Sequence, residues 1–405
     1  MAPIFKVAFL IAVFLVLLRK KVDLGLVLAL NTALTGLLFG MDASGFAAAL
    51  RGALSSHETL VLVAIVALVL YLGAYLQNGG HFRVMLDALK NLVREPRLTL
   101  AAPSAFMGLL PVPAGAMIGA PIVEEAAKRW GLSPAWKTFL NYGFRHIWEY
   151  SWPLYVSLLM AATITRIPIK TLSLVQFPFT LLAAGTGLVI LFRGVPALPF
   201  EENGRKSWPE IRRILFSLWP VLLTIVFVFV FRLSIEAGLG AASLLAFALS
   251  RETLRNRAQT LLRSLSPRII LLVFALMAFK GVLESSGALE ALAGTLRPGG
   301  VSAYVLLFAA PFGVGLLTGM NQAYVAIAFP ILLPLFGESR MDLVPAIFAF
   351  VSGFAGILLS PAHLCLALTV NYFRADWRDV YRLLVPAVAV VFSAALALLI
   401  VFLLS

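Results

Sequence analysis

The sequence is poor in charged residues and in cysteine. Of its 405 residues 13% are charged and 61% are hydrophobic, and Cys365 is the single cysteine. The mean hydropathy of +0.97 excludes an ordinary soluble domain. One cysteine also excludes an intramolecular disulfide and a cysteine-rich metal site. This composition is typical of a polytopic membrane protein.

Signatures of common enzymes are missing as well. The sequence has no HExxH, GxSxG or Walker A motif, and the histidines do not follow a metal-ligand spacing; they are His57, His81, His146 and His363. We therefore expect no catalytic residue, no metal site and no resident cofactor. ATP-driven transport by this chain alone is disfavoured.

The excess of basic residues gives a net charge of +13. Most of these residues fall in short loops between hydrophobic runs, so we attribute the charge to topology and to contact with anionic lipid rather than to nucleic acid. The first run, residues 4–18, is followed by Arg19, Lys20 and Lys21 without a small-residue cleavage site, which predicts a retained span. By the positive-inside rule we expect a multi-pass protein of the cell (inner) membrane with both termini on the non-cytoplasmic side.

Hydrophobic runs of about 17–25 residues, the length that crosses a bilayer, recur from end to end. We expect ten spans, five in each half: residues 4–18, 22–40, 57–77, 133–165 and 170–192, then 212–232, 234–250, 268–286, 343–372 and 380–404.

Two further runs, about 97–129 and 301–335, are too long and too often interrupted for one span each. Each divides at a tip into two half-length limbs, which predicts a re-entrant helical hairpin. Lipid offers no partner to freed backbone groups, so such tips are tolerated only inside protein or beside a cavity. The first tip is PVPAG, with Pro113 and Gly115, and the second contains Thr318, Gly319, Asn321 and Gln322.

The two halves repeat at an offset of about 207 residues. Gly108-Leu-Leu-Pro falls on Gly315-Leu-Leu-Thr, and Pro153 falls within one residue of Pro361. Five spans is an odd number, so the second half should be inverted relative to the first. The expected fold is all-α, with inverted repeats at residues 1–192 and 212–405 and a cytoplasmic linker at 193–211. An ordinary helical bundle with proline kinks is the alternative.

Two spans are expected to break at a proline, at Ser151-Trp152-Pro153 and at Ser360-Pro361. Serine before proline matches a helix N-cap followed by proline in the first turn. Half-helices that start there point free N–H groups and a partial positive charge into the protein. Together with the two hairpin tips, they would form a binding site for an anion.

Three ionisable residues, Arg145, His146 and Glu149, lie one to two turns before Pro153. Such residues inside a span are costly, so they are functional candidates. We expect Arg145 to bind a substrate carboxylate and Glu149 or His146 to carry a coupling proton; a structural ion pair is the alternative. The other candidate substrate ligands are Pro113, Gly115, Ser151, Thr318, Gly319, Asn321, Gln322, Ser360 and His363.

Other polar residues in hydrophobic runs are weaker candidates. Lys280 and Glu284 are at i,i+4 and are expected to form a structural pair. Asn141 and Asn371 are secondary candidates for the site, and the Glu124-Glu125 pair is expected at the membrane interface.

Residues 109–121, LLPVPAGAMIGAP, and 358–373, LLSPAHLCLALTVNYF, resemble the ion transporter superfamily of secondary carriers. The nearest resemblance is to an integral-membrane family related to the gluconate permeases. It implies a homodimer with a dimerising scaffold and a mobile elevator domain, and organic anions as substrates. Sodium-coupled members share a Ser-Asn-Thr motif at both tips, whereas this chain has TGMNQ at one tip and no polar side chain at the other.

The combined prediction is a secondary active transporter of a small organic anion, a carboxylate or sugar acid, coupled to H⁺ rather than Na⁺ and working by an elevator movement. Its partners would be the anion, the lipid bilayer and a second copy of the chain, without nucleic acid. Alternatives are a cation/proton antiporter, a sodium-coupled anion carrier, and an intramembrane lipid-modifying enzyme with His146 and Glu149 as acid and base.

Overall fold

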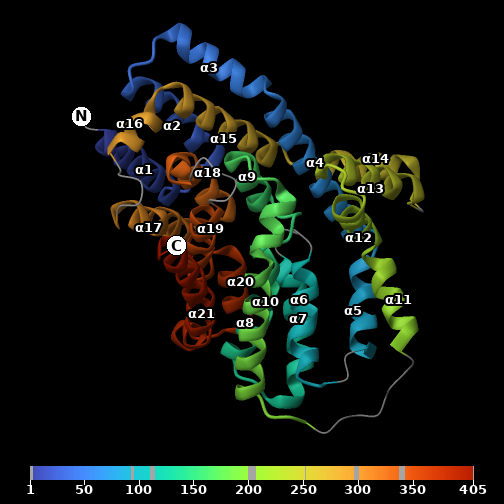
Figure 1. Cartoon of the computed structure of the whole chain (residues 1–405). Coiled ribbons are helices and arrows are strands. Elements are labelled where there is room, and N and C mark those ends of the chain that lie inside the picture. Colours follow the sequence, from blue (N-terminus) through green and yellow to red (C-terminus); the bar gives the residue numbers. More distant parts are fainter. Residues whose placement is uncertain are drawn as a thin grey trace.

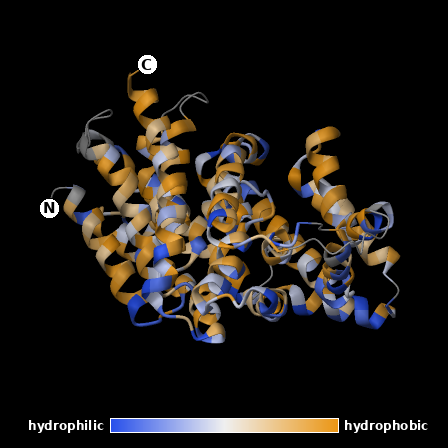
Figure 2. Ribbon diagram, turned by 90° about the horizontal axis from the view of Figure 1, so that it is seen from below, coloured by the Kyte–Doolittle hydropathy of each residue, from blue (hydrophilic) through white to orange (hydrophobic). Residues whose placement is uncertain are grey.

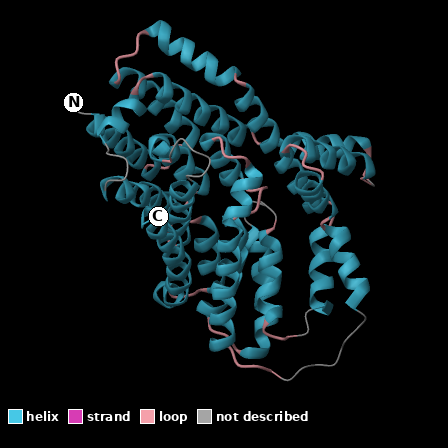
Figure 3. Cartoon of the chain, in the orientation of Figure 1, coloured by secondary structure: helices cyan, strands magenta, loops and turns pink. Residues whose placement is uncertain are grey.

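The computed structural model describes most of the chain as helices joined by loops, without a β-strand among the described residues (Figure 3). Hydrophobic residues predominate along the helices (Figure 2). This architecture confirms the all-α class and is consistent with a helical membrane protein. The described residues are 3–92, 95–109, 115–198, 207–250, 252–295, 301–336 and 343–404.

The helices of the first half run in the order shown in Figure 1. They are α1 (Pro3–Arg19), α2 (Leu24–Leu38), α3 (Ala43–Ser55), α4 (His57–Asn78), α5 (His81–Leu92), α6 (Leu98–Gly108), α7 (Gly115–Ala127), the 3₁₀ turn η1 (Lys128–Trp130), α8 (Pro134–Gly143), the 3₁₀ helix η2 (Phe144–Tyr150), α9 (Val156–Thr165) and α10 (Ile169–Gly194).

The second half continues the all-helical pattern. Its elements are α11 (Ser207–Ser217), α12 (Trp219–Ile225), the π-helical turn η3 (Val226–Val230), α13 (Ile235–Leu249), α14 (Leu254–Ser264), α15 (Pro267–Ser285), α16 (Ala288–Thr295), α17 (Val301–Thr318), α18 (Asn321–Leu332), the 3₁₀ turn η4 (Leu333–Leu335), α19 (Leu343–Leu358), α20 (Leu364–Phe373) and α21 (Trp377–Leu404).

Within the described residues, three helices are long and apolar enough to cross a bilayer by length and composition: α4, α10 and α21. Two bent pairs, α11 with α12 and α14 with α15, raise this number to five. The other predicted spans are occupied by shorter or broken apolar helices. For example, α2 and α13 have 15 residues each, which at 1.5 Å per residue gives a length of about 22 Å.

The prediction of one continuous span at residues 212–232 is wrong. The chain bends by 75° between the segments Trp208–Ser217 and Trp219–Val230. Pro220 is in the first turn of α12, and proline lacks the N–H that a continuous helix needs and clashes with the preceding turn. The bend therefore follows from this proline, which lies within the hydrophobic run.

Two amphipathic helices, α3 and α14, lie between the predicted spans, in segments that no hydrophobic run covers. Each begins with a side-chain N-cap: Asp42 accepts from the N–H of Gly45, and Thr253 accepts from the N–H of Asn256. Asp and Thr are good N-cap residues, so the capping signals were present in the sequence. They were overlooked because neither segment is hydrophobic throughout.

Helices from the two halves of the chain alternate in the packing. α2 packs along α15, and α4 packs along α13 (Figure 1). The limbs of the two predicted hairpins are the pairs α6/α7 and α17/α18, whose members pack on one another; α6 also packs on η2, and α17 on α19. Of the predicted site residues, Arg145, His146 and Glu149 lie on η2, and Asn321 and Gln322 begin α18.

Candidate functional site

Both predicted broken spans contain a β-turn at the proline, between two shorter helices. The N–H of Tyr155 donates to the carbonyl of Trp152, and the N–H of His363 donates to the carbonyl of Ser360, each at 3.1 Å. Pro153 and Pro361 are thus at the second position of a turn, which the fixed φ of proline favours. The following helices start three residues after each proline, α9 at Val156 and α20 at Leu364.

The predicted N-caps at Ser151 and Ser360 are therefore wrong. The hydroxyl of Ser151 forms a hydrogen bond with the hydroxyl of Thr180 in α10, at 2.7 Å. Ser360 donates to the carbonyl of Leu316 at 2.6 Å and accepts from the N–H of Ala362 at 3.2 Å. Ser360 thereby stabilises the turn and joins it to the second hairpin, while Ser151 faces α10.

The first limb of the first broken span ends as a 3₁₀ helix, η2, rather than an α-helix. In a 3₁₀ helix residues three apart are aligned. Accordingly, Nδ1 of His146 lies 2.5 Å from Oε1 of Glu149. The side chains of Arg145, His146 and Glu149 are buried, at 5%, 3% and 4% exposure, so the predicted placement of these ionisable groups inside the protein is met.

The second hairpin reaches this buried carboxylate directly. Nδ2 of Asn321, the first residue of α18, donates to Oε2 of Glu149. Both oxygens of Glu149 are therefore engaged, one by each half of the chain. The sequence does not indicate this contact, because Glu149 and Asn321 are 172 positions apart.

The second broken span is joined to the same hairpin tip. Nδ1 of His363 lies 2.7 Å from the carbonyl oxygen of Gly319. Gly319 has φ +63°, and a Cβ placed on it would lie 2.4 Å from the backbone nitrogen of His363. Only glycine fits a left-handed conformation this close to another backbone, so Gly319 allows the tip to approach His363.

The other polar residues of the second tip are held within it. Thr318 donates to the carbonyl of Val314 at 2.7 Å and accepts from the N–H of Met320 at 3.2 Å. Gln322 is half-buried in the first turn of α18. Of the predicted ligands on this tip, Asn321 and Gly319 are the ones that contact the broken spans.

The first hairpin makes equivalent contacts through backbone carbonyls. Arg145 Nη1 lies 3.4 Å from the carbonyl of Met107, and the hydroxyl of Tyr155 donates to that of Gly108 at 2.5 Å. A Cβ on Gly108 would lie 2.0 Å from the Arg145 carbonyl oxygen, so α6 and η2 are in close backbone contact. Pro113 lies outside the described residues, and Gly115 is the first residue of α7.

The secondary candidates have different surroundings. Asn141 donates to the carbonyl of Ala116 at 2.9 Å and to Thr369 Oγ1 at 3.2 Å, so it connects α8 to α7 and α20. Asn371 is exposed. Glu124 accepts from the hydroxyl of Tyr372 at 3.0 Å, near Lys137 at 3.6 Å.

Lys280 has a closer partner than the one predicted for it. Its Nζ lies 3.1 Å from Glu58 of α4 and 3.8 Å from Glu284. Arg166 lies 3.6 Å from Glu58 and 4.0 Å from Glu284. This four-residue network borders a hollow of about 580 Å³ that α3, α4 and α15 line, well removed in sequence from the hairpin tips.

The structure also brings together two histidines and a cysteine, a cluster that the sequence pattern did not predict. One ring nitrogen of His146, one of His363 and Sγ of Cys365 all lie within 4.8 Å of one another. The two imidazole rings have centroids 5.0 Å apart, and the fully buried ring of Tyr142 packs on both. We call these three residues the His–His–Cys group. The sequence signal was the pair of polar residues two apart, His363 and Cys365, beside a predicted break.

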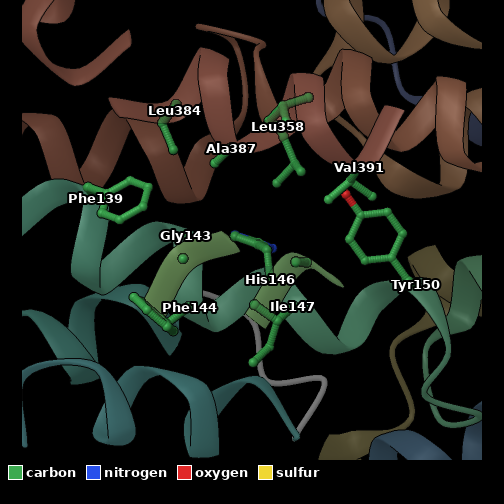
Figure 4. Close-up of a pocket in the computed structure, with 13 residues that line it drawn as sticks. Phe139, Gly143, Phe144, His146, Ile147, Tyr150, Leu358, Leu384, Ala387 and Val391 are labelled. Atoms are coloured by element: carbon green, nitrogen blue, oxygen red, sulfur yellow. The ribbon is translucent and has the colours of Figure 1, made fainter. Parts of the chain in front are cut away.

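A small hollow of about 40 Å³ adjoins the site. Figure 4 shows His146 at its edge, among apolar side chains that include Phe139, Leu358 and Leu384. His146 is the one strongly polar group on this lining apart from the hydroxyl of Tyr150. The hollow suits an apolar group and does not by itself make a site for an anion.

The fold is that of an all-helical protein, consistent with a helical membrane protein, and its buried polar centre is formed by residues of η2, the start of α18 and the turn before α20. A family model described as "Protein of unknown function (DUF401)" matches residues 3–403. The chain therefore belongs to the DUF401 family. A comparison with curated proteins finds no match.

Proposed function

We propose that the protein is a secondary active transporter of a small organic anion, a carboxylate or sugar acid, with the proton as the expected coupling ion. The resemblance to the ion transporter superfamily and the gluconate permeases remains part of this proposal. The observation that carries it is the meeting of two broken spans and two hairpins around the buried Arg145, His146 and Glu149. Broken helices that converge on buried charge are typical of secondary transporters.

The order of the elements supports an inverted repeat. The series α2 to α10 matches the series α13 to α21 in order, including the hairpins, the broken spans and the amphipathic pairs α3/α14 and α5/α16, while α1 corresponds to the bent pair α11/α12 and η2 has no counterpart among the described elements. Special backbone positions match as well. Gly80 and Gly287 both have φ +70°, and Arg166 and Arg374 are left-handed C-caps of α9 and α20, with φ 56° and 54°.

The contacts between halves also come in matched pairs. If α2 corresponds to α13 and α4 to α15, then the pair α2/α15 corresponds to α13/α4, and both pairs pack together. In the same way α9 packs on α18, and α20 packs on α7. Pairwise matching of this kind is what a pseudo-two-fold axis relating the halves predicts.

The proposed transport cycle assigns a role to each part. The hairpins and broken spans would form the mobile elevator unit, and the remaining helices would form the scaffold and a homodimer interface. Arg145 would bind the anion's carboxylate, and Asn321 and Glu149 would link the second hairpin to the first broken span. Release of the Asn321–Glu149 contact would open the site.

The test is transport by the purified full chain in lipid vesicles that contain a pH-sensitive dye. A panel of carboxylates and sugar acids is offered under an imposed proton gradient. We expect one class of anion to enter together with acidification of the lumen. A sodium gradient in place of the proton gradient distinguishes the sodium-coupled alternative, and sodium-driven proton movement without an organic anion identifies an antiporter.

Two buried charges and two exposed ones provide matched variants. We expect Arg145→Gln to lower anion uptake at least tenfold and Glu149→Gln to abolish coupled acidification, whereas Arg166→Gln and Glu125→Gln, at 69% and 70% exposed side chains, leave both unchanged. Normal transport by both buried variants contradicts the assigned site. Product formation from lipid in detergent, without a gradient, supports the enzyme alternative instead.

A further inference from the structure

The ring nitrogens of the His–His–Cys group have defined hydrogen-bonding roles. A carbonyl oxygen only accepts, so Nδ1 of His363, at 2.7 Å from the Gly319 carbonyl, must carry the proton. Nδ1 of His146 faces Oε1 of Glu149 in the same way, and the second oxygen of that carboxylate accepts from Asn321. In the neutral tautomer of each ring, Nε2 is then a bare lone pair.

These two lone pairs are buried and share a single candidate donor. Within the described part of the chain, the Cys365 thiol is the one candidate hydrogen-bond donor to Nε2 of His146 and Nε2 of His363, although the two residues are only 3% and 8% exposed. The Cys365 thiol carries one hydrogen, so it can donate a hydrogen bond to only one of the two Nε2 atoms. A buried polar atom without a partner destabilises the folded protein, so this arrangement favours the binding of a further group that both nitrogens can contact.

We propose that His146, His363 and Cys365 bind a divalent transition-metal ion, with zinc as the preferred metal. Such an ion takes the lone pairs of both Nε2 atoms and of the thiolate. Imidazole nitrogen and thiolate sulfur are the ligands that zinc selects. Magnesium and calcium, like other hard cations, prefer oxygen ligands, so two nitrogens and a sulfur do not suit Na⁺ as the bound ion.

The outer contacts have the form that metal sites use. A histidine ligand commonly donates its other ring N–H to a carboxylate or a backbone carbonyl, which fixes the tautomer and the ring orientation. Glu149 has this role for His146, and Gly319 has it for His363. Tyr142 packs on both rings and limits their rotation.

The distances allow a metal with small movements. In a tetrahedral zinc site the donors lie roughly 3.3–3.6 Å apart, given Zn–N and Zn–S bonds of about 2.0–2.3 Å. The three donors are within 4.8 Å of one another, so each pair must approach by about 1.5 Å at most. Cys365 is half-buried and its neighbours Pro361, Ala362 and Leu364 are exposed, which gives an ion a path to the site. The proposal does not depend on the transport function.

The first experiment is a cobalt titration of the full chain, purified in detergent and freed of metal by a chelator. Cobalt(II) bound to a thiolate absorbs in the near ultraviolet. We expect one Co²⁺ per chain with this absorption, and its loss when Zn²⁺ is added, since zinc binds such sites more tightly. No charge-transfer absorption in the wild-type protein overturns the proposal.

Substitutions identify the ligands. We expect Cys365→Ser to abolish the thiolate absorption and His363→Gln to weaken Co²⁺ binding at least tenfold. Glu149→Gln, which changes only an outer contact, should weaken binding by about 10-fold to 100-fold and keep the absorption. His81→Gln is the matched control, because His81 lies on α5 outside the group. Retention of the absorption in Cys365→Ser refutes the site.

A second readout does not require Cys365 to be replaced. Since Cys365 is the single cysteine, modification by a thiol reagent reports on this site alone. Zn²⁺ should slow the reaction at least tenfold in the wild-type protein and in His81→Gln, but not in His363→Gln. Equal rates with and without Zn²⁺ in the wild-type protein mean that no metal–thiolate bond forms and that the proposal is wrong.

Discussion

The two broken spans share a backbone plan but differ in side-chain chemistry. Both turn at a proline, resume as a helix three residues later, and contact a hairpin through a glycine, Gly108 in the first and Gly315 in the second. Around the first turn lie Arg145, His146 and Glu149. The comparable positions before Pro361 hold Gly353, Phe354 and Ile357.

This difference distinguishes the residues that form the helical framework from those that supply polar groups to the candidate site. Close backbone packing and the proline turns recur in both halves, so they belong to the framework. The buried charge occurs in one half, and the second half adds His363, Cys365 and Asn321 to it. If the halves are repeats, as we propose, the repeated framework would hold one asymmetric site, because each half supplies groups that the other lacks.

The framework part of the comparison predicts the largest effects. A Cβ on Gly108 would lie 2.0 Å from the Arg145 carbonyl oxygen, and one on Gly315 would lie 2.3 Å from that of Gly353. Overpacking costs about 1–3 kcal/mol and occasionally more, and the backbone atoms at these two positions cannot move aside as a flexible side chain can. We expect Gly108→Ala and Gly315→Ala each to lower the thermal unfolding midpoint strongly and to a similar extent.

The controls are helical glycines with open space at Cβ, Gly185 in α10 and Gly313 in α17. Alanine favours a helix over glycine by about 1 kcal/mol, so these variants should unfold at the wild-type temperature or above it. A large effect at Gly108 with none at Gly315 would show that the two hairpins do not pack alike.

The side-chain contact between Glu149 and Asn321 predicts an energetic coupling between the two halves of the chain. Asn321 donates to the buried carboxylate of Glu149, and a hydrogen bond to a charged group contributes about 1.5–3 kcal/mol. In a double-mutant cycle, Asn321→Ala and Glu149→Ala should therefore show a coupling of about 2 kcal/mol in unfolding free energy. The pair Glu149→Ala and Glu125→Ala should be additive, since Glu125 is exposed. Additivity for Asn321 and Glu149 contradicts the link between the halves.

A third test compares residues at equivalent positions, Tyr155 and His363. Each is the residue before a helix start and bonds a hairpin carbonyl, of Gly108 and Gly319 respectively. Tyr155→Phe and His363→Phe should each cost about 1 kcal/mol of stability. Anion uptake should fall at least tenfold only in His363→Phe, because Tyr155 belongs to the framework. Equal anion uptake by the two variants would show that His363 has no more part in anion binding than Tyr155.

The smallest effect is expected at Ser151. Its hydroxyl bonds Thr180 of α10, so it faces away from the proposed anion site despite its place beside the break. Ser151→Ala should cost about 1 kcal/mol of stability and leave the KM for the anion unchanged. Ser55→Ala, on the exposed end of α3, serves as control. A raised KM for Ser151→Ala alone would restore this residue to the site.

Much of the framework could be predicted because its signals are local. Hydrophobic runs, the interrupted stretches at 97–129 and 301–335, and the matched prolines indicate helices, hairpins and breaks without knowledge of packing. The helix starts were wrong because Ser-Pro is compatible with an N-cap and with a β-turn. Contacts of Ser360 with Leu316 and Ala362 decide between them, and sequence spacing does not contain those contacts.

The site residues were found individually, but their partners were not. Arg145, His146, Glu149, Asn321 and His363 are conspicuous as polar groups in apolar runs. Their pairing depends on which faces the two halves turn toward each other, and on η2 being a 3₁₀ helix rather than an α-helix. Nothing in the sequence singles out Cys365 as a metal ligand. Its partners His146 and His363 come from two segments far apart in the chain, so the three residues follow no recognisable spacing.

The packing of α2 on α15 and of α4 on α13 has a consequence for biosynthesis. The partner of α2 emerges roughly 230 residues after it, which at about 5–20 residues per second is a delay of some 10–45 seconds. In the bilayer that we propose for this protein, lipid tails would cover the waiting faces at little cost, since they are as apolar as leucine side chains. Lipid would then be the first partner of these helices, and the second half of the chain would displace it as it is made.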